Sequence, residues 1–199
     1  MMLIDRYLPG FEFTEVQEIE VDAPPAVTYA AIRETDLRDP VIDALFAVRE
    51  LPNRIVRRMR GEAPPRAPAS LTFGDVATRD MGWLLLGEEP GSEFVVGSIG
   101  QFWRRDYGWH PVAAEEFAGF AEPGYAKLAV SFRVRSTEAG GTVLRYEART
   151  ATTDDVARTR FRRYWRLIHP GIAIVMHRAL TRIRDEAERR FAAARAGVS

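Results

Sequence analysis

The first regular pattern in the chain is an alternation of apolar and polar residues over positions 11–22, "FEFTEVQEIEVD", which predicts a β-strand. The apolar positions on one face of this strand are Phe11, Phe13, Ile19 and Val21. Glu15 and Gln17 fall on the same face, where polar side chains require hydrogen-bonding partners or a wet cavity. These two residues are therefore the first candidates for polar groups inside the fold.

Helical signals follow the strand. Asp22 is expected to cap a helix whose first turn holds Pro24 and Pro25 and which continues through "AVTYAAIRET". Further helical spacing follows Pro40 and is interrupted at Pro52, and another turn or two is expected in "NRIVRRMRG" before Gly61. The proline-rich residues 61–70 predict a loop.

Strand patterns dominate the next 80 or so residues, as a series of antiparallel strands would. "WLLLGEEPGSEFVVGSIGQFW" predicts a hairpin, because two apolar runs flank a Glu-Pro-Gly-Ser turn, and "YAKLAVSFRVR" and "TVLRYEARTAT" both alternate. The inward positions of the last two segments are Ala126, Leu128, Val130, Phe132, Val134, Leu144, Tyr146 and Ala148. Their outward positions carry Arg133, Arg135, Arg145, Glu147 and Arg149, which are expected to pair across strands.

The C-terminal region contains a helical pattern with a proline in its middle. Asp154 and Asp155 mark its start, because acidic groups are favoured at a helix N-terminus. Apolar residues on both sides of Pro170 stay on one stripe, and Pro170 falls on the opposite side. The sequence therefore predicts one long helix that bends at Pro170. The alternative is a break into two helices, with His169 near the second start.

Together these elements predict an α+β, helix-grip fold, in which a curved antiparallel sheet wraps around a long kinked C-terminal helix. We expect residues 1–199 to form a single domain, since a chain of this length suits one domain. The space between such a sheet and its helix is the natural place for a ligand.

Composition narrows the function classes. The chain has 28 basic and 28 acidic residues, so its overall charge favours neither nucleic acid nor an anionic membrane. "RTRFRRYWR" mixes arginines with aromatics, but the helical projection places the aromatics inward and Arg162, Arg163 and Arg166 outward, so no nucleic-acid partner is expected. No signal-peptide pattern and no apolar run of the roughly 20 residues that span a bilayer are present, so we expect a cytoplasmic protein without a membrane span.

The sequence resembles the START/polyketide-cyclase-like superfamily, also called SRPBCC or birch-pollen-allergen-like. "IEVDAPPAVTYAAI" resembles the entry strand and first helix of that superfamily, and "EPGYAKLAVSFRV" and "YWRLIHPG" look like a bacterial branch of it. The resemblance covers nearly the whole chain and concerns the fold. It implies a deep, mostly apolar pocket between the sheet and the C-terminal helix. Members of the superfamily bind lipids, sterols, polyketides or plant-hormone-like molecules, and a minority are enzymes.

No strong catalytic or metal-binding motif occurs. The chain lacks cysteine, a nucleotide-binding loop, a nucleophile elbow and a His-Glu-x-x-His helix. His169 and His177 are eight residues apart and too splayed for a metal-binding helix, so neither a metal nor a cofactor is expected. His169 lies at the edge of the apolar stripe, where it reaches either the pocket or solvent.

The inward positions give the candidate ligand-binding residues, which are Gln17, Phe102, Trp103, Phe132, Tyr146, Trp165, Ile172 and Met176. Each of these positions is also compatible with ordinary core packing. The first hypothesis is binding of a hydrophobic small molecule that is lipid-, polyketide- or sterol-like. The second is a polyketide cyclase or dehydratase that uses acid–base catalysis in the same cavity, with Tyr146 and Glu15 as candidate groups. The third is a protein-interaction module in which the back of the helix contacts either the first helices or another subunit of a homodimer, because Leu167 and Ile174 project away from the stripe.

Overall fold

The computed structural model describes residues 1–36, 39–40, 72, 82–104 and 106–197. Its elements, in chain order, are α1 (Ile4–Tyr7), β1 (Phe13–Val21), α2 (Pro25–Glu34), β2 (Leu84–Glu89), β3 (Glu93–Gly100), α5 (Ala114–Phe117), β4 (Ala126–Ser136), β5 (Thr142–Thr152) and α6 (Asp155–Ala196). The helices predicted after Pro40 and the loop predicted over residues 61–70 lie outside the described residues.

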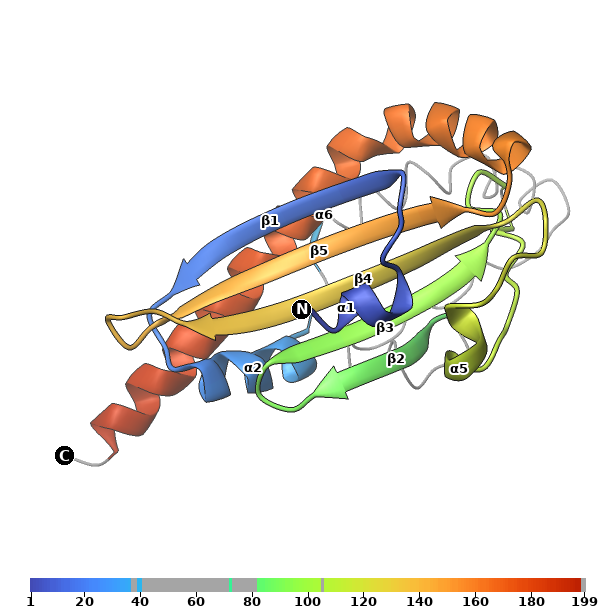
Figure 1. Cartoon of the computed structure of the whole chain (residues 1–199). Helices are drawn as coiled ribbons and strands as arrows, with labels where there is room; N and C mark the ends of the chain where they lie inside the picture. The colour runs from blue at the N-terminus through green and yellow to red at the C-terminus, as the bar shows by residue number, and fades with distance from the viewer. Residues whose placement is uncertain (37–38, 41–71, 73–81, 105, 198–199) are drawn as a thin grey trace, which may run out of the picture.

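The five strands form one antiparallel sheet in the order β1-β5-β4-β3-β2. Helices α2 and α6 cover one face, here called the inner face, and α1 lies on the opposite, outer face (Figure 1). This arrangement confirms the predicted α+β, helix-grip fold and the predicted hairpin, whose strands are β2 and β3.

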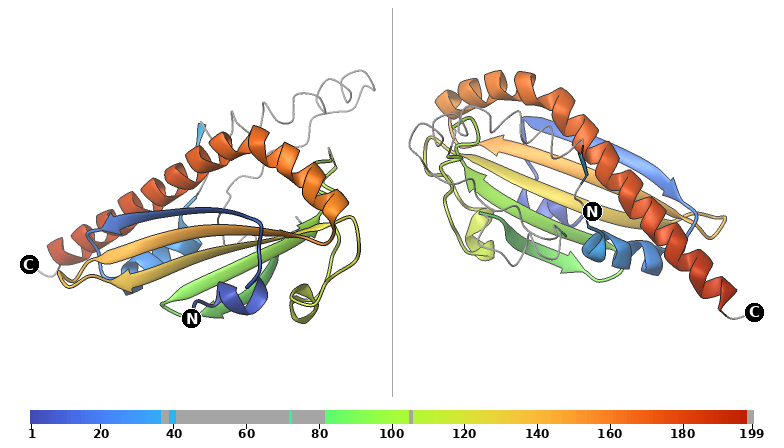
Figure 2. Two further views of the ribbon diagram at one scale, coloured as in Figure 1. Left: turned by 45° about the horizontal axis from the view of Figure 1, so that its top comes forward. Right: turned by 180° about the vertical axis from the view of Figure 1, so that it is seen from behind.

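Helix α6 continues through Pro170 without a break, as predicted from the continuous apolar stripe. It begins at Asp154, whose carboxylate accepts a hydrogen bond of 2.7 Å from the backbone N–H of Ala157. The helix bends in its orange part and arches over the sheet (Figure 2). Pro170 has no N–H for the carbonyl four residues earlier, and its side chain lies on the exposed side of the helix.

The outer face is more buried than the sequence indicated. Glu147 and Arg149 were predicted to point outward, yet they are only 3% and 5% exposed. Helix α1 covers this part of the sheet, and the Glu93 carboxylate accepts hydrogen bonds from the backbone N–H groups of Leu3 and Ile4 at 2.8 and 3.1 Å. A short N-terminal helix is thus anchored on a buried acid.

The predicted cap of α2 is wrong in detail. Pro24, with extended backbone, occupies the N-cap position and no side chain caps the helix. The backbone N–H of Asp22 instead donates a hydrogen bond to the Glu188 carboxylate of α6. The two prolines leave fewer free N–H groups at the helix start, and the N–H of Val27 donates a hydrogen bond of 3.0 Å to the carbonyl of Pro24 in place of a side-chain cap.

Candidate functional site

Two separate groups of buried side chains hold α6 on the inner face. The first lies under the C-terminal half of α6, where Ala179, Leu180, Ile183 and Ala187 pack with α2 and the sheet. The second lies under its N-terminal end, where Phe161 packs with Phe102 and Ala126. The helix is therefore clamped to the sheet at two places, on either side of its bend.

The part of α6 between these groups, residues 165–175, is here called the arch segment. Its apolar side chains Ile168, Ile172 and Val175 are half-buried and belong to neither buried group. On the sheet, Leu128, Tyr146 and Ala148 are likewise only partly buried. Apolar surface on the inner side of the fold thus stays partly accessible in the middle of the helix.

Polar side chains from β1 meet the arch segment. The Nε2 atom of His169 lies 2.8 Å from Oε2 of Glu15. The side-chain amide of Gln17 donates to Oε1 of Glu15 at 3.2 Å and to the backbone carbonyl of Ala173 at 2.9 Å. Glu15, Gln17 and His169, here called the polar cluster, therefore tie the edge strand to the helix on both sides of Pro170.

Tyr146 lies beside this cluster. It is the β5 partner of Gln17 in the sheet register, and its ring centroid is 4.1 Å from that of Phe132. Burial raises the pKa of the Tyr146 hydroxyl well above its usual range. The phenol therefore stays protonated at neutral pH and is suited to donate a hydrogen bond rather than to transfer a proton.

Of the eight predicted ligand-binding residues, three are buried in the core and five are half-buried. Phe102, Phe132 and Met176 are 5%, 0% and 1% exposed, so they are core residues in this structure. Those that are half-buried are Gln17, Trp103, Tyr146, Trp165 and Ile172. Their role in ligand binding stays a prediction.

Two of the half-buried residues are tryptophans in the aromatic group under the start of α6. Trp165 stacks on Phe161 with ring centroids 6.0 Å apart, and it also contacts the ring of Phe13 at 6.0 Å and the imidazole of His169 at 4.9 Å. Trp103 meets Phe161 edge to face. This aromatic group lies at the N-terminal end of the arch segment, where Trp165 contacts His169 of the polar cluster.

Sequence reasoning identified Glu15 and His169 separately but missed their pairing. The available signal was the acidic residue on an apolar strand face, which demands a partner. His169, at the edge of the apolar stripe, was the histidine placed to supply it. The acid–base role suggested for Glu15 and Tyr146 stays a prediction.

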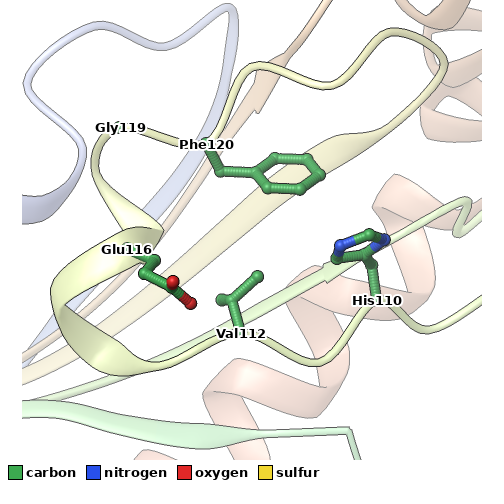
Figure 3. A pocket seen from close by; sticks show the side chains of 5 residues that line it. All are labelled: His110, Val112, Glu116, Gly119 and Phe120. Atoms are coloured by element: carbon green, nitrogen blue, oxygen red, sulfur yellow. The ribbon is translucent and has the colours of Figure 1, made fainter.

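A second feature is a hollow of about 450 Å³ lined by His110, Val112, Glu116, Gly119 and Phe120, none of which was predicted as a site residue. The side chains of Phe120, Val112 and His110 point into the same space (Figure 3). The His110 ring packs against Phe120 and Tyr125, with centroids 4.8 and 5.1 Å apart. Phe120 and Val112 pack with the buried residues of the outer face, so the hollow is separate from the arch.

Over the described ranges, no three or more His, Cys, Asp or Glu side chains are grouped so as to hold a metal ion. In the same part of the chain, no helix is both long and apolar enough to cross a membrane.

Neither a family model nor a curated protein matches the sequence. Several solved structures are similar in overall arrangement. Protein MLL2253 from Mesorhizobium loti is 13% identical, with a TM-score of 0.41 and coverage of 89% of this chain and 98% of its own. CalU16 from Micromonospora echinospora is 16% identical, with a TM-score of 0.29 and coverage of 90% and 86%. An AHSA1-like protein from Rhizobium etli is 18% identical, with a TM-score of 0.33 and coverage of 88% and 82%.

Likenesses this distant say nothing about the ligand or the chemistry of this chain. The order of its elements and the position of α6 on the sheet are themselves those of a helix grip. The described chain thus has the helix-grip fold that the resemblance to the START/SRPBCC superfamily implied.

Proposed function

We propose that the chain binds a hydrophobic small molecule, lipid-, polyketide- or sterol-like, between the inner face of the sheet and the arch segment. The observation that carries the proposal is the half-buried state of Ile168, Ile172 and Val175 between two fully buried groups. Covering apolar surface stabilises a complex by roughly 25 cal/mol per Å². Burying about 500 Å² of apolar surface in total gains about 12 kcal/mol, which leaves about 8 kcal/mol, a micromolar affinity, after an association cost of about 4 kcal/mol.

The first test is mass spectrometry of the purified protein under native and then denaturing conditions, which detects a co-purifying hydrophobic compound. The second is titration with the neutral fluorescent dye Nile red, using a matched pair of variants. Ile172→Trp enlarges a half-buried side chain at the proposed ligand site, whereas Ile174→Trp alters a side chain that is 45% exposed on the other side of the helix. We expect Ile172→Trp to weaken dye binding by about tenfold or more and Ile174→Trp to leave it unchanged. Equal binding by both variants and the unchanged protein would contradict the proposal.

An acid–base enzyme, such as a polyketide cyclase or dehydratase, is the second candidate function. It is favoured by the 2.8 Å contact between Glu15 and His169, because a carboxylate that orients an imidazole is a common arrangement of a general base. Tyr146, held protonated by its raised pKa, is suited to act as a hydrogen-bond donor. Incubation with linear polyketide-like substrates, followed by mass spectrometry, tests this candidate. Turnover that persists in both Glu15→Gln and His169→Gln would exclude the pair from catalysis.

We also propose that residues 1–199 form a single domain and that the exposed side of α6 allows a homodimer. Leu167, 81% exposed, and Ile174 lie on that side of the helix. Light scattering at several concentrations measures the mass of the particle, and a monomer at every concentration would refute the dimer.

A further inference from the structure

We infer that the polar cluster is the head-group end of the ligand site, and that it selects amphipathic molecules whose polar end donates hydrogen bonds, such as alcohols and amines, over carboxylates. This inference rests on the proposed function, since it assigns the chemistry of the same site. Three features of the polar cluster support this selectivity: the hydrogen-bonding capacity that it leaves unused, its charge, and its position next to apolar surface.

The hydrogen-bonding positions that the polar cluster leaves unused are acceptor positions. The amide nitrogen of Gln17 has two hydrogens, and both have described partners, Glu15 and the carbonyl of Ala173. Its Oε1 atom can therefore only accept a hydrogen bond. Each oxygen of Glu15 takes part in one described hydrogen bond, whereas a carboxylate offers about four acceptor sites. The arrangement suits a donor arriving from the ligand.

The charge of the cluster also favours a hydrogen-bond donor over a carboxylate. Glu15 carries a negative charge, Gln17 is neutral, and His169 is neutral or positive, so neither state of the imidazole gives the cluster a net positive charge. The nearest arginines along α6, Arg162, Arg163 and Arg166, are exposed. A carboxylate head group would thus meet the carboxylate of Glu15, because the imidazole of His169, the one group of the cluster able to carry a positive charge, is already paired with Glu15, and juxtaposed like charges are unfavourable.

The position of the cluster explains why its ligand would be amphipathic. Gln17 bonds to the carbonyl of Ala173, the residue next to Ile172, and Trp165 packs against the imidazole of His169. The Glu15 side chain is 18% exposed and that of His169 is 42% exposed, so both remain accessible from solvent. A ligand tail along Ile168 and Ile172 would place its polar end within reach of Glu15.

The experiment compares three probes with the same ten-carbon tail, decanol, decylamine and decanoate, by displacement of Nile red at pH 7.5. Decanol and decylamine should each bind about tenfold more tightly than decanoate. Glu15→Gln should remove most of the advantage of decylamine over decanoate. Glu20→Gln, an exposed carboxylate on the same strand, should preserve it. Circular dichroism of both variants verifies that the fold is retained.

The outcomes separate the two proposals. Decanoate binding as tightly as decanol or more tightly overturns the inference about the head group, while hydrophobic binding beneath the arch stands. Binding of none of the three probes, together with no displacement of Nile red, overturns both. An unchanged preference in Glu15→Gln overturns the assignment of the selectivity to the polar cluster, and Glu15→Asp, which keeps the charge, should retain the preference.

Discussion

His169, the residue immediately before the only proline inside α6, is joined to Glu15 of the edge strand by a contact of 2.8 Å. Together with the Gln17–Ala173 hydrogen bond, it fastens the bent part of the helix to β1. The helix is thus held at its bend by polar contacts and on either side of the bend by apolar packing. Glu15 and His169 are far apart in sequence, so this link is a purely tertiary feature.

This link predicts an energetic coupling between the two side chains. In urea unfolding, Glu15→Gln and His169→Ala should each lower the free energy of unfolding by about 0.5–1 kcal/mol. The loss is small because a charge-assisted hydrogen bond contributes less to stability when one partner is substantially exposed to solvent. The double variant should lose less than the sum of the single losses. Glu20→Gln serves as the control on the same strand. Strict additivity would show that the two groups do not interact in solution.

Pro170 is predicted to oppose stability while it shapes the arch. Pro170→Ala restores a backbone donor for the carbonyl four residues earlier, and a proline inside a helix costs about 3 kcal/mol. We expect a higher melting temperature and weaker binding of Nile red, because a straighter helix changes the space beneath the arch segment. Thermal unfolding and dye titration of the variant measure the two effects. A lower melting temperature would mean that packing of the bent helix outweighs the missing hydrogen bond.

The sequence predicted the architecture because the fold is encoded in local periodicity. The alternation predicted the strands β4 and β5, and the continuous stripe across Pro170 predicted one unbroken helix; both elements were confirmed. Glu15 and Gln17 were recognised as polar groups on an apolar face for the same reason. Periodicity states which face is buried, but it does not state which residue of another element covers it.

This limit of hydrophobic patterns explains the two main differences between the predicted and the observed structure. Glu147 and Arg149 are polar and follow the outward phase of β5, so the pattern assigned them to solvent, although α1 covers them. The partnership of Glu15 with His169 depends on where the bend places the helix along β1. Both facts are set by the docking of distant segments, which hydrophobic patterns do not encode.

The buried Glu93 is predicted to be the main anchor of α1. Its carboxylate is 1% exposed and accepts hydrogen bonds from Leu3, Ile4 and the hydroxyl of Ser131. Glu93→Ala leaves these donors unpaired at a cost of about 1–3 kcal/mol each. We expect a loss of several kcal/mol in denaturant unfolding and faster hydrogen exchange at the amides of Leu3 and Ile4. The control is Glu89→Ala, whose exposed carboxylate lies 3.7 Å from Arg6, and it should change stability little.

Asp5 is predicted to make the anchoring of α1 sensitive to acid. A hydrogen bond from the Arg149 guanidinium, 2.8 Å away, lowers the pKa of Asp5 below its ordinary value. A lowered folded-state pKa means that the stabilisation is complete above the unfolded pKa of about 3.9 and is lost as the pH falls through the folded value. Asp5→Asn should therefore reduce stability at pH 7 and flatten the decline of stability below pH 4. Arg149 keeps Glu147 and the carbonyl of Leu8 as partners, so the variant should still fold. Urea unfolding at a series of pH values measures both effects. If the decline of stability below pH 4 is the same in the variant, Asp5 is not ion-paired in solution.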